Sequence, residues 1–191
     1  MISFFSETTG NTIPIDQIYF GPPNIRWNLP SLDRTIIQSQ KNYPKDISYG
    51  IIEEKLAEFK GKSELRIAIL NAMSHAIGDN LVGMRAFDFW RLKVQELLPN
   101  TKIIISFFKI NPRDITNQYN TIDNVYAMPC KLTLLLEHDA FVDLGPVKDP
   151  DIQQDWETMN MIDFYFKVFS INPETVPLEH KRMKYEFCRI N

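Results

Sequence analysis

Residues 65–80 read LRIAILNAMSHAIGDN, and the architecture of the chain follows from this stretch. Its first part, residues 65–73, is a nearly continuous apolar run, which is typical of a central parallel strand buried on both faces. A short loop, residues 74–79, leads into residues 80–98, whose apolar side chains recur at helical spacing as far as Pro99. The stretch therefore predicts a strand, a tight loop and an amphipathic helix in succession.

The rest of the chain continues this alternation. Apolar runs predict further strands at 102–108, 124–128 and 140–144, and further helices at 131–137 and 153–170. Such an alternation favours an α/β fold with a Rossmann-like, doubly wound and mostly parallel sheet. The helix at 153–170 carries a row of apolar side chains, so we expect it to cover one side of the sheet.

The sequence before residue 65 has a different character. Prolines interrupt its short apolar runs, at positions 14, 22, 23, 30 and 44. Short strands and turns are therefore expected there, with one short helix at 51–60, because Gly61 stands where a helix commonly ends. The sequence indicates two parts, an N-terminal β-rich extension at 1–64 and a Rossmann-like domain at 65–191.

Composition narrows the class of function. Lysine and arginine total 21 against 24 aspartate and glutamate, a net charge of -3, so the chain lacks the basic field that nucleic-acid binding requires. The two cysteines, Cys130 and Cys188, have no metal-ligand spacing, and no metal site is expected. No apolar run is long enough to span a bilayer. We expect a cytoplasmic protein with at most peripheral contact at the inner membrane face.

The loop after the first strand is the best candidate for a functional site. Ligands of open α/β sheets bind outside the carboxyl ends of the strands. Here Gly78 lets the backbone approach a ligand closely, Asp79 supplies a carboxylate, and the helix amides near Asn80 can face a phosphate. Ser74 and His75 share the loop and are candidate substrate contacts. The competing interpretation is that Asp79 or Asn80 only caps the helix.

One further substrate contact is predicted outside this loop. Asp143 ends the strand at 140–144 and faces the same crevice in a doubly wound topology, although hydrogen bonding to a neighbouring loop explains it equally well. His138 and His180 are interpreted as surface residues, since nothing in the sequence links them into a ligand set. The basic segment at 181–184 is interpreted as a solvated tail rather than a membrane contact.

Several of these segments resemble a known enzyme family. RIAIL at 66–70, the loop at 74–79, and the helix that ends at 98–99 before the strand at 102–108 are similar to the N-terminus of the ADP-heptose lipopolysaccharide heptosyltransferases, glycosyltransferase family 9. That family opens with a strand, a Ser-x-x-Gly-Asp or similar loop, and a helix. Later segments keep the same order: IDNV at 122–125, FVDLG at 141–145 and MIDFY at 161–165. The resemblance covers residues 65–175.

The resemblance implies a GT-B fold, in which two Rossmann-like domains face each other and this chain supplies the acceptor side. It implies a metal-independent, inverting transfer of sugar from a nucleotide-sugar donor to a glycan or glycolipid acceptor, without a cofactor. Asp79 matches the family acid that takes the proton from the attacking hydroxyl. The donor domain would be a missing or separate C-terminal part.

Two alternatives remain open at the level of the sequence. Residues 1–64 precede the first strand, Arg85 stands where the family often has proline, and no donor domain follows in the chain. A non-catalytic Rossmann-like binding module or partner subunit fits these departures. A flavodoxin-like nucleotide or flavin binder would share the doubly wound layer, but the first loop lacks the small hydroxyl and glycine residues that wrap a flavin phosphate.

Overall fold

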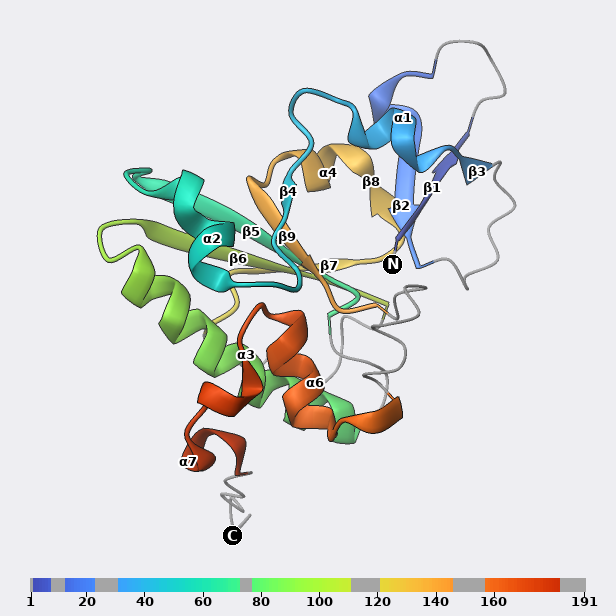
Figure 1. Ribbon diagram of the computed structural model, residues 1–191. Helices are drawn as coiled ribbons and strands as arrows, with labels where there is room; N and C mark the ends of the chain where they lie inside the picture. Colours follow the sequence, from blue (N-terminus) through green and yellow to red (C-terminus); the bar gives the residue numbers. More distant parts are fainter. Residues whose placement is uncertain are drawn as a thin grey trace, which may run out of the picture.

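The computed structural model describes residues 2–7, 13–22, 31–72, 77–110, 121–145 and 157–182. Its centre is a parallel sheet of five strands in the order β4-β9-β5-β6-β7 (Figure 1). The α/β class is confirmed, and the parallel sheet is consistent with a Rossmann-like fold. The strands are β4 (Lys45–Asp46), β9 (Ala140–Asp143), β5 (Glu64–Leu70), β6 (Lys102–Lys109) and β7 (Asn124–Ala127).

The first predicted strand lies in the middle of this sheet. β5 pairs in parallel with β9 on one side and with β6 on the other. Its residues from Ile67 to Leu70 are fully buried, and alternate side chains point to opposite faces of the sheet. The prediction of a central strand covered on both faces is confirmed.

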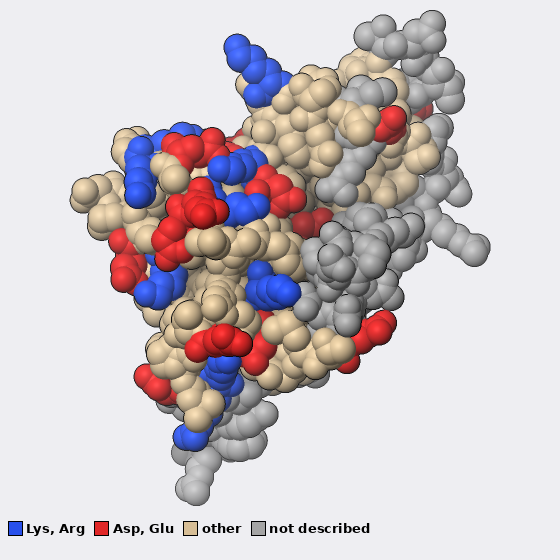
Figure 2. All heavy atoms as spheres, viewed as in Figure 1, with Lys and Arg blue, Asp and Glu red and all other residues tan. Residues whose placement is uncertain are grey.

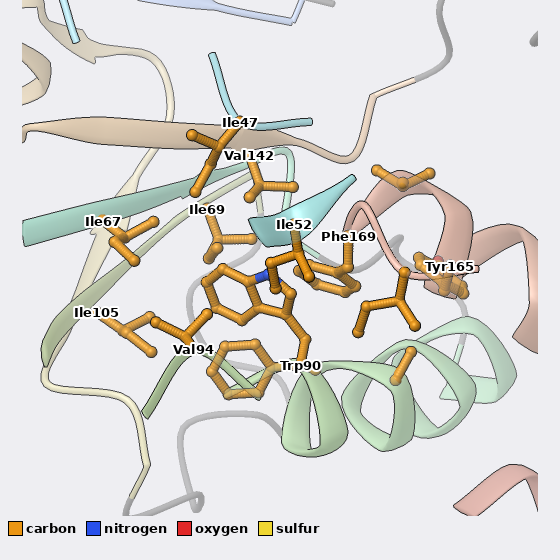
Figure 3. Close-up of a cluster of buried hydrophobic side chains, with 14 of the residues drawn as sticks. Ile47, Ile52, Ile67, Ile69, Trp90, Val94, Ile105, Val142, Tyr165 and Phe169 are labelled. Atoms are coloured by element: carbon orange, nitrogen blue, oxygen red, sulfur yellow. The ribbon is translucent and has the colours of Figure 1, made fainter. Parts of the chain in front are cut away.

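Three helices cover one face of the sheet. They are α2 (Ile52–Leu56), α3 (Ile77–Leu97) and α6 (Met161–Val168), and Figure 1 shows α3 and α6 side by side below the strands. Trp90 of α3 lies within the core they form, with ring centroids 5.9 Å from Phe87 and 5.1 Å from Phe169 (Figure 3). This core joins both long helices to the sheet.

A second, antiparallel sheet and a short helix cover the opposite face. The sheet has the order β3-β1-β2-β8, with β3 at Ser31–Leu32, β1 at Ser3–Ser6, β2 at Ile18–Gly21 and β8 at Cys130–Lys131. The helix is α4 (Leu132–Leu136). Phe20 of β2 packs on Phe108 of β6 at 5.3 Å between ring centroids. The doubly wound arrangement is therefore not confirmed, because this face carries mainly strands.

The N-terminal region and the rest of the chain exchange strands. β4, from before residue 64, pairs with β9, and β8, from after it, pairs with β2. A separate N-terminal extension is therefore not confirmed, although short strands and the predicted short helix are present in it. α2 ends at Leu56, earlier than predicted, but a 3-10 turn continues it to Phe59, and Gly61 follows with a left-handed φ of 86°. Short helical turns complete the described elements: η1 (Ile15–Gln17), α1 (Arg34–Gln38), η2 (Ala57–Phe59), η4 (Pro173–Thr175) and α7 (Leu178–Lys181).

The last long helix is shorter than predicted. α6 begins only after Asn160, whose backbone is extended and whose side chain accepts a hydrogen bond from the Asp163 amide at 3.1 Å. The Asn160 amide group also donates to the Asp163 carboxylate at 2.7 Å. A continuous helix through this point is wrong, because Asn160 satisfies the first amides of α6 as an N-cap. The first predicted residues, 153–156, lie outside the described ranges.

Candidate functional site

The exit of the chain from β5 is held from both neighbouring strands. Asn71, the first residue after β5, has a left-handed φ of 54°, and its side-chain amide donates to Asp143 Oδ1 of β9 at 2.7 Å. The backbone amide of Ala72 donates to the carbonyl of Phe108 in β6 at 3.0 Å. The direction in which the chain leaves the central strand is therefore fixed on two sides.

α3 starts earlier than the sequence indicated. It begins at Ile77, so Gly78 and Asp79 lie in its first turn and not in the preceding loop. Neither Asp79 nor Asn80 occupies the N-cap, because they are the third and fourth helical residues. A carboxylate in a first turn still stabilises a helix by about 0.3–1 kcal/mol through the helix dipole. The side chain of Asp79 is partly exposed, which leaves it accessible to a ligand.

Asp79 shares its surroundings with a buried phenol. Burial raises the pKa of Tyr165 in α6, and the negative charge of Asp79 raises that pKa further. The Tyr165 hydroxyl is therefore protonated at neutral pH and able to donate a hydrogen bond. The Tyr165 ring lies in the hydrophobic core, and its place on an apolar helix face gave no indication of a role for the hydroxyl.

The other predicted contacts in this region differ in accessibility. Gly78 is exposed, and a Cβ added there would meet no heavy atom within 4 Å among the described residues. Asn80 is only 1% exposed, so its side chain is enclosed by the protein and is not presented to solvent. Ser74 and His75 lie outside the described residues. Gly78 and Asp79 thus lie together at the surface, whereas Asn80 is buried and is not accessible to a ligand.

Asp143 takes part in internal hydrogen bonding. It is 6% exposed, and its Oδ1 accepts from the side chain of Asn71 and from the amide of Gly145 at 2.9 Å. Its own backbone amide donates to Ser48 Oγ at 2.8 Å. The loop-bonding alternative therefore describes Asp143, and a direct contact with substrate stays a prediction.

Lys109 was not predicted as a notable residue from the sequence. It is the last residue of β6, at the same edge of the sheet as Asn71, and it is 1% exposed. Such deep burial of a lysine is uncommon, because an ammonium group loses much solvation free energy. The predicted strand stopped at residue 108, although a lysine between Phe108 and Ile110 was a visible signal.

Arg85 of α3 forms hydrogen bonds to α7, the last helix in the described part of the chain. Its guanidinium donates to the carbonyls of His180 at 3.1 Å and Glu179 at 2.7 Å. The ring of His180 lies 4.8 Å from Phe89, so His180 is half-buried and not a free surface residue. In the basic segment, Lys181 pairs with a carboxylate of α6, Asp163, at 2.6 Å. Residues 183–184 lie outside the described part of the chain.

A hollow of about 440 Å³ opens at the opposite edge of the sheet, near the amino ends of β4, β9 and β5. Its lining includes the ion pair of Lys62 with Asp139 at 2.5 Å, and it includes Glu58, which pairs with Lys45. Both ammonium groups also lie over the Phe59 ring, at 5.7 and 5.8 Å from its centroid. Acidic and basic side chains alternate over this surface around α2 (Figure 2). Glu137 also lines the hollow, so acidic side chains outnumber basic ones in its lining, and no positive field is available there to attract an anion.

His138 lines the same hollow and is buried, so its interpretation as a surface residue is wrong. Its ring lies 5.5 Å from that of Phe108, and its Nδ1 is 2.9 Å from the carbonyl oxygen of Leu134. Burial lowers the pKa of His138. The side chain packs against Phe108 between the two sheets, because residue 138 lies in the short connection from α4 to β9.

This burial predicts a pH dependence of stability. The folded-state pKa of His138 lies below the unfolded value of about 6.5. As pH falls through 6.5 the unfolded chain therefore binds the proton first, and the folded state loses up to about 1.4 kcal/mol per pH unit from this group. Urea unfolding at pH 7.5 and 5.5 should show a smaller loss for His138→Gln than for wild type. Equal losses would rule out a buried neutral imidazole.

No family model matches the sequence, and no curated protein and no solved structure matches it. Within the ranges that the structure describes, no three histidine, cysteine, aspartate or glutamate side chains are grouped to hold a metal ion. None of the helices described is both long enough and apolar enough to cross a membrane. Function must therefore be inferred from the geometry of the site.

Proposed function

We propose that this chain is the acceptor-side domain of a heptosyltransferase-like, metal-independent and inverting glycosyltransferase of GT-B architecture. The observation that supports it is the position of Asp79. This partly exposed carboxylate lies in the first turn of the helix that follows the central strand of a parallel sheet. Ligands of open α/β sheets bind at that edge.

The proposed chemistry uses Asp79 as a general base. The acceptor hydroxyl attacks the anomeric carbon of a nucleotide sugar and forms the new carbon–oxygen bond. The bond to the nucleoside diphosphate breaks on the opposite face, so the configuration inverts. The hydroxyl proton passes to Asp79, and the electron pair of the broken bond leaves with the diphosphate. A base within hydrogen-bond reach of the hydroxyl contributes about 10²- to 10⁴-fold to such a step.

Two neighbouring features suit this reaction. The first free amides of α3 carry partial positive charge and favour a negatively charged ligand such as a phosphate. Tyr165 is near enough for the charge of Asp79 to raise the pKa of its hydroxyl, which is protonated at neutral pH. We place the reaction in the cytoplasm, on a glycan or glycolipid acceptor, with a donor domain supplied by a C-terminal part or a partner subunit.

Gly78→Ala tests whether substrate approaches the backbone here. The added methyl meets no atom of the described protein within 4 Å, and alanine favours a helix by up to about 1 kcal/mol. Thermal stability should therefore stay equal or rise. A closely approaching acceptor would lose contact, and its KM should rise by about tenfold, equivalent to about 1.4 kcal/mol. Steady-state kinetics and thermal unfolding of the full-length protein measure both quantities.

Gly61→Ala is the matched control. Its φ of 86° disfavours alanine, so stability should fall by about 1–2 kcal/mol, while the acceptor KM stays unchanged. An unchanged KM for Gly78→Ala would show that no substrate group reaches this turn.

The alternative is a non-catalytic Rossmann-like binding or partner subunit. The burial of Asn80 and the internal bonding of Asp143 favour it, because they withdraw two predicted contacts from the site. Calorimetric binding of a nucleotide sugar or acceptor without any release of nucleoside diphosphate would select this alternative.

A further inference from the structure

Left-handed backbone gathers at one edge of the parallel sheet. Among the described residues, the non-glycine positions with positive φ are Tyr49 at 53°, Asn71 at 54° and Ser170 at 60°. They follow β4, β5 and α6 respectively, so they come from three separate segments of the chain. A left-handed residue with a side chain costs about 1–2 kcal/mol. Such conformations persist where the surrounding structure holds them, and they cluster at functional sites.

Hydrogen bonds join the first and the third of these segments, those that follow β4 and α6. Ser170 Oγ donates to the carbonyl of Ile47 at 2.7 Å, and the amide of Tyr49 donates to the carbonyl of Val168 at 3.0 Å. The end of β4 is thus tied to the end of α6. Ser170 takes the place that glycine usually holds after a helix, and its hydroxyl makes the bond that glycine could not.

The same network continues to the end of β5. Ser48, next to Tyr49, accepts the Asp143 amide at 2.8 Å, and Asp143 Oδ1 accepts the Asn71 side chain at 2.7 Å. Asn71 is therefore the last member of a chain of bonds that runs across the carboxyl edge from α6 through β4 and β9. It is also the point from which the backbone departs towards α3.

We propose that Asn71 is a positioning residue for the proposed transfer, because its bond to Asp143 fixes the exit from β5 and thereby the first turn of α3 with Asp79. This inference rests on the proposed function. Asparagine combines the two properties required here: it tolerates a left-handed φ, and it presents a neutral amide donor to a carboxylate. Asn71 acts through Asp79 and does not touch the substrate.

Asn71→Gly removes the hydrogen bond to Asp143 but keeps the left-handed backbone conformation, so it separates the effects of the two. Glycine keeps the left-handed φ without strain, so the variant should fold, but the bond to Asp143 is lost. The amides of residues 81–84 bond to the carbonyls of the first turn of α3, so they report on that turn. Their hydrogen exchange should accelerate by about tenfold, whereas exchange in residues 90–97 stays unchanged. In the full-length protein kcat should fall by about tenfold or more at nearly constant acceptor KM.

Two further variants sharpen the test. Ser170→Gly relieves left-handed backbone at the far end of the network, and exchange of residues 81–84 should not change. The double variant Asn71→Asp with Asp143→Asn restores an amide–carboxylate pair with reversed partners, so kcat should recover to within a few-fold of wild type, whereas Asn71→Asp alone places two carboxylates together and should not recover.

The outcomes separate this inference from the proposed function. Unchanged exchange in Asn71→Gly overturns the positioning role whatever the activity, and so does accelerated exchange with unchanged kcat. If the wild-type protein transfers no sugar, the proposed function is overturned. That outcome is seen in the activity assay and does not depend on hydrogen exchange. Accelerated exchange together with a selective loss of kcat and rescue by the double variant supports both.

Discussion

Asp79→Asn is expected to lower the kcat of the full-length protein by about 10²- to 10⁴-fold while the fold remains intact. The amide has the shape of the carboxylate but cannot accept the proton of the attacking hydroxyl. Because Asp79 is partly exposed in the first turn of α3, its replacement should cost no more than the helix-dipole contribution of about 1 kcal/mol. Release of nucleoside diphosphate and urea unfolding measure the two effects separately.

Asp88→Asn provides the control on the same helix. Asp88 lies nine residues further along α3, about 13 Å from Asp79, and burial raises the pKa of its carboxyl group. The same chemical change at this place should leave kcat within a few-fold of wild type. An Asp79→Asn variant that turns over as fast as Asp88→Asn would remove Asp79 from the mechanism.

Trp90→Ala is expected to cost about 3–5 kcal/mol of stability, the largest loss for a single truncation in this core. Trp90 is 1% exposed and contacts Phe87 of its own helix and Phe169 at the end of α6. Its removal leaves a cavity between α3, α6 and the sheet (Figure 3). Domains of this size are stable by only about 5–15 kcal/mol, so denaturant unfolding should show a large shift of the midpoint.

Leu92→Ala tests whether this cost comes from burial. Leu92 lies on the same helix two residues away and is 61% exposed. Its truncation should change the free energy of unfolding by no more than about 0.5 kcal/mol. Similar losses for the two variants would contradict the placement of Trp90 in the core.

The main strands could be predicted from the sequence because each of them is itself a run of apolar residues. β5 is covered on both faces, and its continuous apolar run identifies it as a buried strand without any information on which strands lie beside it. β4 was not predicted, since Lys45 and Asp46 carry no apolar pattern and are placed by pairing with β9. The antiparallel sheet over the second face was not foreseen either, because periodicity shows that a side chain is buried but not what covers it.

Only part of the candidate site was predicted from the sequence. Gly78 and Asp79 were identified from their place after a buried strand, which is a local property. Asn71 gave no signal, because its partner Asp143 lies 72 residues away in the sequence. The role of the Tyr165 hydroxyl was likewise beyond reach, since it arises from the groups that the fold places around it, whereas the lysine at 109 within an apolar run was a signal that the prediction did not use.

The most direct test of the proposed mechanism is the stereochemistry of transfer. Full-length protein is incubated with a nucleotide sugar and a glycan acceptor in the presence of EDTA, and the anomeric proton of the product is followed by NMR. A base that deprotonates the attacking hydroxyl without metal assistance gives a product of inverted configuration at undiminished rate. A product of retained configuration, or no transfer to any acceptor, would contradict it.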